Sequence, residues 1–259
     1  MDKSRCVNGI TGHALVLGGS GGLGAEIVRT LAASCASAVS FTYGRNKKAA
    51  DDLLAELRAD GIKAFAAPAD LSDEPGFNKV LDDAVTSTGQ EISLAINSIG
   101  ISPNIPIEQQ TLDGPEGWRR VFEINVFGCF ISTRAIAERM KARGVKGSIV
   151  LITSTNGINS HSQISTHYDS SKAAQGHMMK IFAEHYAPAD IRINGVAPGW
   201  IETSMNDTLP ADERANELSK IWARRFAAPH EIASFVVFVG GSGGSYAVGQ
   251  NFMVDGGYR

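Results

Sequence analysis

The sequence predicts an α/β protein of one domain, in which a doubly wound parallel sheet of about seven strands carries helices on both faces. Short apolar runs rich in β-branched residues recur along the 259 residues, and amphipathic stretches separate them. Strands that are buried on both faces read as such continuous apolar runs, and parallel strands need long crossovers, usually helical, between them. No low-complexity linker or internal repeat divides the chain, so residues 1–259 are predicted to form one domain.

Each predicted strand is a run of four to six residues. The runs are His13–Leu17, Ala38–Tyr43, Ile62–Ala67, Ile92–Asn97, Ser148–Thr153, Ile191–Val196 and a short last one, Asn251–Val254. Helical spacing fills the intervals, for instance at Ala50, Leu53, Leu54 and Leu57, and at Val80, Leu81, Ala84 and Val85. Two longer periodic segments run from Trp118 to Met140 and from Asp169 to Tyr186. The glycine-rich stretch 240–244 lacks the lysine of a phosphate-binding loop and is predicted to be a simple loop.

The composition excludes several classes of protein. A net charge of −3 gives no electrostatic reason to expect a nucleic acid or an anionic membrane as partner. Cys6, Cys35 and Cys129 are odd in number and widely spaced, which predicts neither a disulfide framework nor a metal site and fits a reducing compartment. Residues 1–11 lack the apolar core of a signal peptide and are predicted to be an N-terminal extension. No run approaches the roughly 18–20 apolar residues of a membrane span, so a cytoplasmic location is expected.

The first predicted strand leads directly into a glycine-rich turn, residues 17–24, and then into an apolar helix. Glycines at such a turn let the backbone approach a pyrophosphate, and the helix N-terminus offers free N–H groups and a favourable dipole. Two glycine registers fit, namely 19, 21 and 24, or 18, 22 and 24. The turn therefore indicates a dinucleotide site without fixing the register.

The end of the second predicted strand favours NADP(H) over NAD(H). An NAD site places Asp or Glu about twenty residues after the turn, to accept hydrogen bonds from the ribose 2′-hydroxyl. Residues 41–48 contain no carboxylate, whereas Gly44 leaves space and Arg45 offers a guanidinium to a 2′-phosphate. The alternative is a solvated basic loop that opens the next helix.

Three residues form a candidate catalytic group. Tyr168 and Lys172 are spaced i, i+4, so they lie on one face at the start of a helix. An ammonium group beside a phenol stabilises the phenolate, and Lys172 is therefore expected to lower the pKa of Tyr168. Ser154 ends a predicted strand at the carboxyl edge of the sheet, where open α/β folds bind ligands, and could hold a substrate oxygen.

Taken together, these motifs resemble the short-chain dehydrogenase/reductases of the single-domain type with about 250 residues. The resemblance covers nearly the whole chain. Its pieces are Gly18-x-x-x-Gly22-x-Gly24, Asp70-Leu71, Asn97-Ser98-Ile99-Gly100, Asn125, Ser154, Tyr168-x-x-x-Lys172, Pro198-Gly199 and Asp255-Gly256-Gly257. It implies a Rossmann fold that binds a dinucleotide and catalyses hydride transfer between a nicotinamide cofactor and a carbonyl/alcohol pair, as alcohol dehydrogenases and ketoreductases do.

The resemblance also implies a role for each matching residue. Tyr168 would be the general acid in reduction, and Lys172 would bind the nicotinamide ribose and lower the tyrosine pKa. Ser154 would orient the carbonyl, and Asn125 would hold a water in the proton relay. The remaining cofactor residues implied are Gly18, Ser20, Gly22, Leu23, Gly24, Arg45, Asp70, Leu71, Asn97, Gly100, Pro198, Gly199, Ile201 and Thr203.

Some positions depart from the family pattern. Leu17 replaces a threonine, Ser98-Ile99 replaces Asn-Ala, and Ser154 and Tyr168 stand fourteen residues apart, one more than expected, so the loop 156–167 is expected to be reshaped. His161 and His167 flank the site, and His167 could tune Tyr168 or touch substrate, although a packed or solvated histidine is the simpler interpretation. A metal site is not expected, because no cluster has ligand spacing.

For the substrate, residues 191–203 are most similar to 3-oxoacyl-[acyl-carrier-protein] reductases. That similarity implies a 3-oxoacyl thioester or related apolar ketone, and possible docking of an acyl carrier protein. Ala189-Asp190 replaces the basic residue expected there, although Arg139, Lys141, Arg143 and Lys146 could form a basic patch. Residues 200–222 are predicted to be a substrate lid. Its apolar members are Trp200, Met205, Leu209, Leu218, Ile221 and Trp222.

Two other functions stay open. The same fold could work oxidatively on a secondary alcohol such as a sterol, a sugar or a catabolic intermediate. A non-catalytic dinucleotide sensor is a third hypothesis, which the presence of both Tyr168 and Lys172 disfavours. The resemblance further implies a homotetramer or homodimer, in which the segment 118–140 would pair across a two-fold axis.

Overall fold

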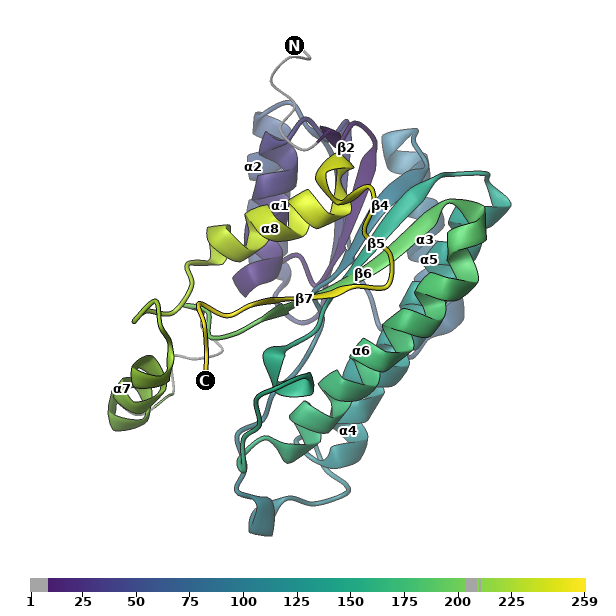
Figure 1. Ribbon diagram of the computed structural model, residues 1–259. Coiled ribbons are helices and arrows are strands. Elements are labelled where there is room, and N and C mark those ends of the chain that lie inside the picture. Colours follow the sequence, from purple (N-terminus) through teal and green to yellow (C-terminus); the bar gives the residue numbers. More distant parts are fainter. Residues whose placement is uncertain (1–8, 204–208, 210) are drawn as a thin grey trace.

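The computed structural model describes residues 9–203, 209 and 211–259. At its centre lies a sheet of seven parallel strands in the order β3-β2-β1-β4-β5-β6-β7 (Figure 1). The strands are β1 (His13–Leu17), β2 (Ala38–Tyr43), β3 (Lys63–Pro68), β4 (Ile92–Asn97), β5 (Gly147–Ile152), β6 (Ile191–Pro198) and β7 (Asn251–Val254). The strand order reverses between β1 and β4, and ligands of open α/β sheets bind outside the carboxyl ends of the strands at such a point.

The structure confirms all seven predicted strands and the doubly wound fold. Strands β3 and β5 are shifted by one residue from the predicted bounds. Strand β6 runs two residues further, because Ala197 and Pro198 pair with Met253 and Val254 of β7. A contact with the far end of the chain therefore sets this boundary.

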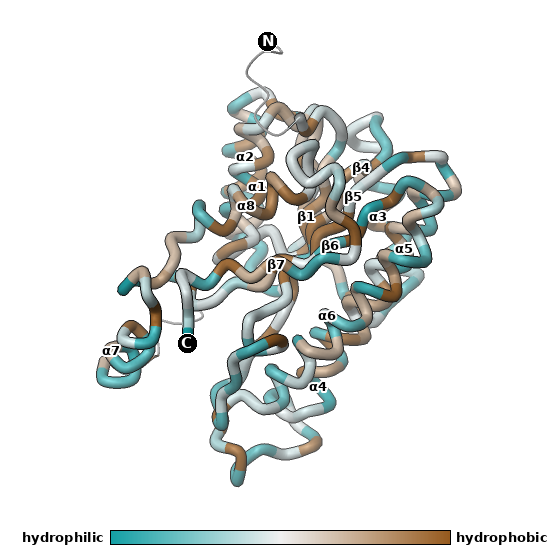
Figure 2. The backbone as a smooth tube through the Cα atoms, in the orientation of Figure 1, coloured by the Kyte–Doolittle hydropathy of each residue, from teal (hydrophilic) through white to brown (hydrophobic). Residues whose placement is uncertain are grey.

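Helices cover both faces of the sheet (Figure 1). One layer holds α1 (Gly22–Ala33), α2 (Lys47–Ala59) and α8 (Pro229–Gly240), and the other holds α3 (Glu74–Thr88), α5 (Cys129–Ala142) and α6 (Thr166–Tyr186). Along β1, Val16 faces the first layer while Leu15 and Leu17 face the second, as the two-residue period of a strand requires. Figure 2 shows the apolar residues gathered in the strands and on the helix faces that cover them. Helix α7 (Ala211–Lys220) lies apart from both layers.

The periodic segment 118–140 is helical throughout, as its pattern predicts, but part of it is π-helical rather than α-helical. It consists of α4 (Trp118–Phe122), a π-helical segment at Glu123–Gly128, and α5. The π-helical segment holds Asn125, whose buried side chain bonds to the backbone of Ile101 in the loop after β4. Single π-helical turns are rare and occur often at functional sites.

The glycine-rich stretch 240–244 contains the end of α8 and a short 3₁₀ turn, Ser242–Gly244, rather than only a loop. The Arg192 guanidinium donates hydrogen bonds to the carbonyls of Val239, Gly240 and Gly244. These bonds satisfy carbonyl groups that have no partner within the helix.

Three further expectations concern the N-terminal extension, the cysteines and membrane-spanning helices. The N-terminal extension falls mostly outside the described residues, as does Cys6. Cys35 and Cys129 are both free thiols. Among the described residues, none of the helices combines the length and the apolar character that crossing a bilayer would need.

Candidate active site

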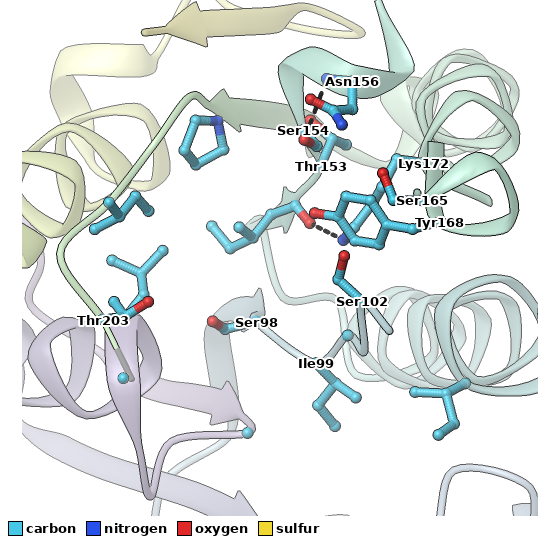
Figure 3. A pocket seen from close by; sticks show the side chains of 18 of the residues that line it. Ser98, Ile99, Ser102, Thr153, Ser154, Asn156, Ser165, Tyr168, Lys172 and Thr203 are labelled. Carbon is cyan, nitrogen blue, oxygen red and sulfur yellow. Dashed lines mark hydrogen bonds between the residues drawn. The ribbon is translucent and has the colours of Figure 1, made fainter. Parts of the chain in front are cut away.

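A cavity of about 1260 Å³ opens at the carboxyl edge of the sheet, where the strand order reverses (Figure 3). Ser154, Tyr168 and Lys172 all line it. Most of the predicted cofactor residues line it as well, namely Gly18, Ser20, Gly22, Leu23, Gly24, Arg45, Asp70, Leu71, Gly100, Pro198, Gly199, Ile201 and Thr203. The predicted catalytic and cofactor residues therefore share one cavity, except for Asn97 and Asn125.

The backbone of the first turn decides between the two glycine registers. Gly18 and Gly22 have φ values of 77° and 51°, in the left-handed region that favours glycine. A Cβ on Gly24 would stand 2.1 Å from the carbonyl oxygen of Gly18, closer than any real contact. Gly21, in contrast, is extended and a Cβ there would meet no atom within 4 Å. Gly19 has no room for a side chain either, because a Cβ there would stand 2.6 Å from the Cβ of Phe41, so Gly21 alone separates the two registers and leaves 18, 22 and 24 as the one that the turn requires.

The N-terminus of α1 fits the phosphates of a dinucleotide. Its N-cap, Gly21, contributes no side-chain hydrogen bond, and no acidic residue stands in the first turn. The first N–H groups and the positive end of the dipole are thus available for an anion. At the end of β3, hydrogen bonds from Ser72 lower the pKa of the Asp70 carboxyl, which stays ionised at the cavity wall. This cradle fits a nicotinamide dinucleotide.

Arg45 lines the cavity just after β2 and, in the described part of the chain, forms no ion pair. The two lysines that follow differ, because Lys47 and Lys48 pair with Asp51 and Asp52 one helical turn on. Of these three neighbouring cations, Arg45 alone faces the cavity with its charge unpaired.

The chain brings Ser154, Tyr168 and Lys172 together from two elements. Ser154 follows β5 as the cap of a 3₁₀ turn and accepts a hydrogen bond from the Asn156 amide. Tyr168 and Lys172 stand on successive turns at the start of α6, with the Lys172 Nζ 5.7 Å from the centre of the Tyr168 ring. Figure 3 shows the three side chains converging on the cavity.

Lys172 does not lower the pKa of Tyr168 in this structure, contrary to the sequence-based prediction. Burial raises the tyrosine pKa, a hydrogen bond with Ser154 acts against that rise, and the nearby Asp169 carboxylate adds to it. The Lys172 ammonium is directed to other partners: it donates to the carbonyl of Ile152 at 2.7 Å and to Gln175 Oε1 at 3.1 Å. Burial lowers the pKa of Lys172 to about 8.

Asn97 and Asn125 hold the backbone behind the cavity wall. Asn97 donates to Ser132 and accepts from the amide of Ile99. Asn125 accepts from the amide of Ile101 and donates to its carbonyl and to Ser171. Asn97 therefore shapes the loop after β4, and it is not among the described residues that line the cavity. A water-holding role for Asn125 stays a prediction.

Two polar residues on the buried side of α6, Asp169 and Gln175, were not predicted from the sequence. Asp169 accepts hydrogen bonds from Asn156, from the amide of Ser162 and from Ser165, which ties down the loop that precedes the helix. Gln175 is fully buried and binds the Lys172 ammonium. Both are polar residues close in sequence to Tyr168 and Lys172, and that proximity is the signal that could have revealed them.

The flanking histidines do not face the cavity. His167 is fully buried, its ring lies 6.0 Å from that of Trp118, and neither ring nitrogen has a hydrogen-bond partner among the described residues. His161 is exposed. The packed and the solvated interpretations of these residues therefore fit better than a contact with substrate.

The described part of the predicted lid is less apolar toward the cavity than its sequence suggests. Trp200 and Leu209 line the cavity, but Ile221 is buried where its backbone bridges to Tyr258. Trp222 is 64% exposed and stacks with Arg259, and Leu218 is not among the lining residues. The contacts of Ile221 with Tyr258 and of Trp222 with Arg259 turn this part of the segment away from the cavity. Met205 lies outside the described residues.

The predicted basic patch is largely neutralised by ion pairs. Arg139 pairs with Asp82 and Glu91, and Lys146 pairs with Asp190. Lys146 directly precedes β5, whereas Ser154 follows its other end, about 20 Å away at 3.3 Å per residue. The patch is therefore at the edge of the sheet opposite the cavity.

Comparison with known proteins agrees with this geometry. A family model described as "Enoyl-(Acyl carrier protein) reductase" matches residues 18–259. The sorbose reductase sou1 of Schizosaccharomyces pombe is 33% identical over 252 residues, 94% of each chain. The chain belongs to the short-chain dehydrogenase/reductase family. It is an oxidoreductase that interconverts an alcohol and a carbonyl with a nicotinamide cofactor.

Two other similar members of this family differ in the carbonyl compounds that their names give. The 3-oxoacyl-[acyl-carrier-protein] reductase FabG of Thermotoga maritima is 31% identical over 246 residues, 94% of this chain and 96% of that one. A solved structure of a 7α-hydroxysteroid dehydrogenase with NADH and 7-oxo glycochenodeoxycholic acid has a TM-score of 0.88 at 29% identity. It covers 100% of this chain and 98% of that one. These short-chain dehydrogenase/reductases act on different carbonyl compounds, so family membership fixes the reaction and leaves the substrate open.

We predict that kcat/KM for the reduced cofactor is constant at lower pH and falls above about pH 8. Lys172 is charged below its pKa of about 8 and loses its proton above it, which removes the cation expected to bind the ribose. In Lys172→Arg the guanidinium keeps its charge, so the decline should move to a pH at which Tyr168 itself titrates. Initial rates from pH 6 to 10 measure both profiles. A decline near pH 8 that persists in Lys172→Arg would show that another group titrates there.

Proposed function

We propose that this chain reduces a ketone to a secondary alcohol with NADPH, and that Tyr168 is the general acid. The observation that carries the proposal is the convergence of Ser154, Tyr168 and Lys172 on the cavity that the glycine turn opens. A dinucleotide sensor would need neither the phenol nor the ammonium there, so the convergence supports an enzyme.

Each catalytic side chain has a separate task in this proposal. The Ser154 hydroxyl donates a hydrogen bond to the substrate carbonyl oxygen, and Tyr168 gives that oxygen a proton as it gains negative charge. Lys172 holds the ribose hydroxyls, while Asn125 holds a water that returns a proton. When bound, the cofactor supplies the hydride. In the opposite direction Tyr168 is the base, so oxidation of a secondary alcohol is the second candidate, and the cofactor ratio in the cell decides between them.

We predict that Tyr168→Phe lowers kcat by at least about 10²-fold, the scale of a lost general acid. Affinity for NADPH should change little, because the ring stays in place and only the hydroxyl is removed. Stopped-flow or steady-state rates at 340 nm and fluorescence titration with NADPH measure the two quantities. Tyr186→Phe is the matched control, since that hydroxyl lies on the same helix and donates to Glu138 instead. Near-normal turnover in Tyr168→Phe would rule out its role as the acid.

Preference for NADP(H) over NAD(H) is part of the proposal. The unpaired guanidinium of Arg45 and the absence of a carboxylate after β2 support it. Gly44 leaves room beside them, because a Cβ there would meet no atom within 4 Å.

We predict that Arg45→Ala weakens NADPH binding about 10- to 100-fold, as expected for a lost charge-assisted hydrogen bond of about 1.5–3 kcal/mol. NADH binding should weaken far less, because NADH has no 2′-phosphate. Fluorescence titration with both cofactors gives the dissociation constants. In the control, Lys47→Ala, the lost charge is already paired with Asp51, so neither affinity should change. Equal losses for both cofactors in Arg45→Ala would exclude a role in reading the 2′-phosphate.

A 3-oxoacyl thioester or other apolar ketone is the substrate that the resemblance suggests. The relationship to the FabG of Thermotoga maritima supports it, and Trp200 and Leu209 give the cavity some apolar lining. Docking of an acyl carrier protein gains no support from the basic patch, whose charges are paired at the opposite edge of the sheet. Rates with acetoacetyl thioesters of the carrier protein and of coenzyme A test this substrate class.

We also propose a homotetramer, in the cytoplasm, built on two different apolar faces. On the first, Phe127 of the π-helical segment and Ile181 of α6 are 58% and 59% exposed, and the rings of Phe130 on α5 and Phe182 on α6 contact each other. On the second, Tyr246 is fully exposed near the edge strand β7, and Met253 is 49% exposed. Two self-complementary faces per chain generate a closed tetramer, whereas one face generates a dimer.

We predict that Phe127→Asp combined with Ile181→Asp converts a tetramer into dimers, because buried charges oppose pairing through the first face. Light scattering after size-exclusion chromatography measures the mass of each species. Leu112→Asp is the control, since Leu112 is equally exposed at 63% but lies in the loop before α4. A monomeric parent chain, or an unchanged mass in the double variant, would contradict the proposed arrangement.

A further inference from the structure

The substrate end of the cavity has a polar lining. Beyond the cofactor cradle its wall is built by the loop after β4, the loop between β5 and α6, and helix α7. Those segments contribute mainly hydroxyl, amide and carboxylate side chains, with Ile99 and Ile164 as their aliphatic members, and Trp200 and Leu209 line the cavity from the segment before α7. An acyl chain in this place would remove water from these polar groups and return no hydrogen bonds.

A buried carboxylate fixes one side of this wall. Asp169, only 9% exposed, accepts hydrogen bonds of 2.8 Å from Asn156, 2.7 Å from the Ser162 amide and 3.0 Å from Ser165. A buried carboxylate is costly unless it is fully bonded, so the loop 156–165 is held where it can satisfy Asp169. This is the loop with one residue more than the family pattern. The hydrogen bonds to Asp169 therefore hold the polar side of this loop in the cavity wall.

Helix α7 provides the opposite wall, and it is anchored as well. The Glu217 carboxylate accepts hydrogen bonds from the Trp200 indole, Lys220 and the Tyr258 hydroxyl. Burial alone would raise the pKa of Glu217, but these three donors outweigh it and lower that pKa. The helix thus presents an ionised carboxylate to the cavity, with Asn216 beside it.

Several lining groups keep their hydrogen-bonding capacity for a ligand. Asn156, Ser160 and Ser165 bond to one another or to Asp169. In contrast, the side chains of four other lining residues have no hydrogen bond within the described part of the chain: Ser102, Asn104, Gln163 and Asn216. Figure 3 shows the Ser102 hydroxyl in the cavity near Tyr168. Ser102 thus lies close to Tyr168, and Asn104, Gln163 and Asn216 are exposed residues that line the same cavity.

We propose that the substrate is a polyhydroxylated ketone of sugar or polyol type, whose hydroxyl groups bond to Ser102, Gln163 and Asn216. In its reduction the carbonyl carbon accepts the hydride of the reduced cofactor, and the carbonyl oxygen accepts the proton of Tyr168. The product is the corresponding polyol and the oxidised cofactor. This inference rests on the proposed reductase function and replaces the apolar substrate class with a polar one. Sites built to hydrogen-bond a substrate hydroxyl discriminate strongly against analogues that lack it.

The test compares kcat/KM with NADPH for ketopentoses and ketohexoses, for 2-alkanones of the same chain length, and for acetoacetyl thioester. The best hydroxylated ketone should exceed the matching alkanone by about 10²-fold or more. A higher kcat/KM for an alkanone or the thioester than for every hydroxylated ketone would overturn the substrate class. Failure of the chain to oxidise NADPH with any of these carbonyls would overturn the reductase function itself, so the two failures are distinguishable.

Variants of the wall give a second, independent test. Ser102→Ala and Asn216→Leu should each lower kcat/KM for the hydroxylated ketone about tenfold and leave that for the alkanone unchanged, because the alkanone has no group for them to bind. Asn159→Leu is the control. It makes the same change on the neighbouring loop at an exposed residue that does not line the cavity, and it should alter neither rate. Equal losses for both ketones in Ser102→Ala and Asn216→Leu would show that these side chains do not read hydroxyl groups.

Discussion

The buried ammonium of Lys172 joins α6 to the end of β5, and the geometry of the site follows from this contact. A buried charge is unfavourable unless it is hydrogen-bonded, and the ammonium finds its partners in the Ile152 carbonyl and Gln175. The Ile152 carbonyl belongs to the last residue of β5, two residues before Ser154. Tyr168 stands one helical turn before Lys172. One bond between a helix and a strand end therefore brings the serine, the tyrosine and the lysine to the same cavity.

The same burial accounts for the acid–base properties of the site in this structure. Loss of water around the ammonium lowers the pKa of Lys172 to about 8, and loss of water around the phenol raises that of Tyr168. With its ammonium bonded to Ile152 and Gln175, the lysine is 5.7 Å from the tyrosine ring and leaves the phenol protonated. A protonated phenol suits a general acid, which must deliver a proton to the carbonyl oxygen.

The sequence predicted those parts of the fold that depend on short-range patterns. The strands were predictable because both of their faces are buried, and the glycine turn because its backbone demands glycine at 18, 22 and 24. What failed depends on contacts between distant segments. The 118–140 helix changes to π-helical geometry around Asn125, which binds the backbone of Ile101, and the apolar lid loses Ile221 to a bridge with Tyr258. Local periodicity carries no information about either contact.

The two ends of the cavity differ in how they are built, and this difference explains why the reaction is easier to predict than the substrate. At the cofactor end the constraint is the backbone: an added Cβ on Gly24 would collide with the Gly18 carbonyl, so the requirement is visible as a motif. At the substrate end the chemistry depends on side chains of loops and of α7, such as Gln163 and Asn216, which no motif marks. Their position follows from the anchors at Asp169 and Glu217. In the sequence, each anchoring carboxylate is indistinguishable from an ordinary surface residue. The polar wall can therefore be recognised only from the structure, which shows the hydrogen bonds of both carboxylates.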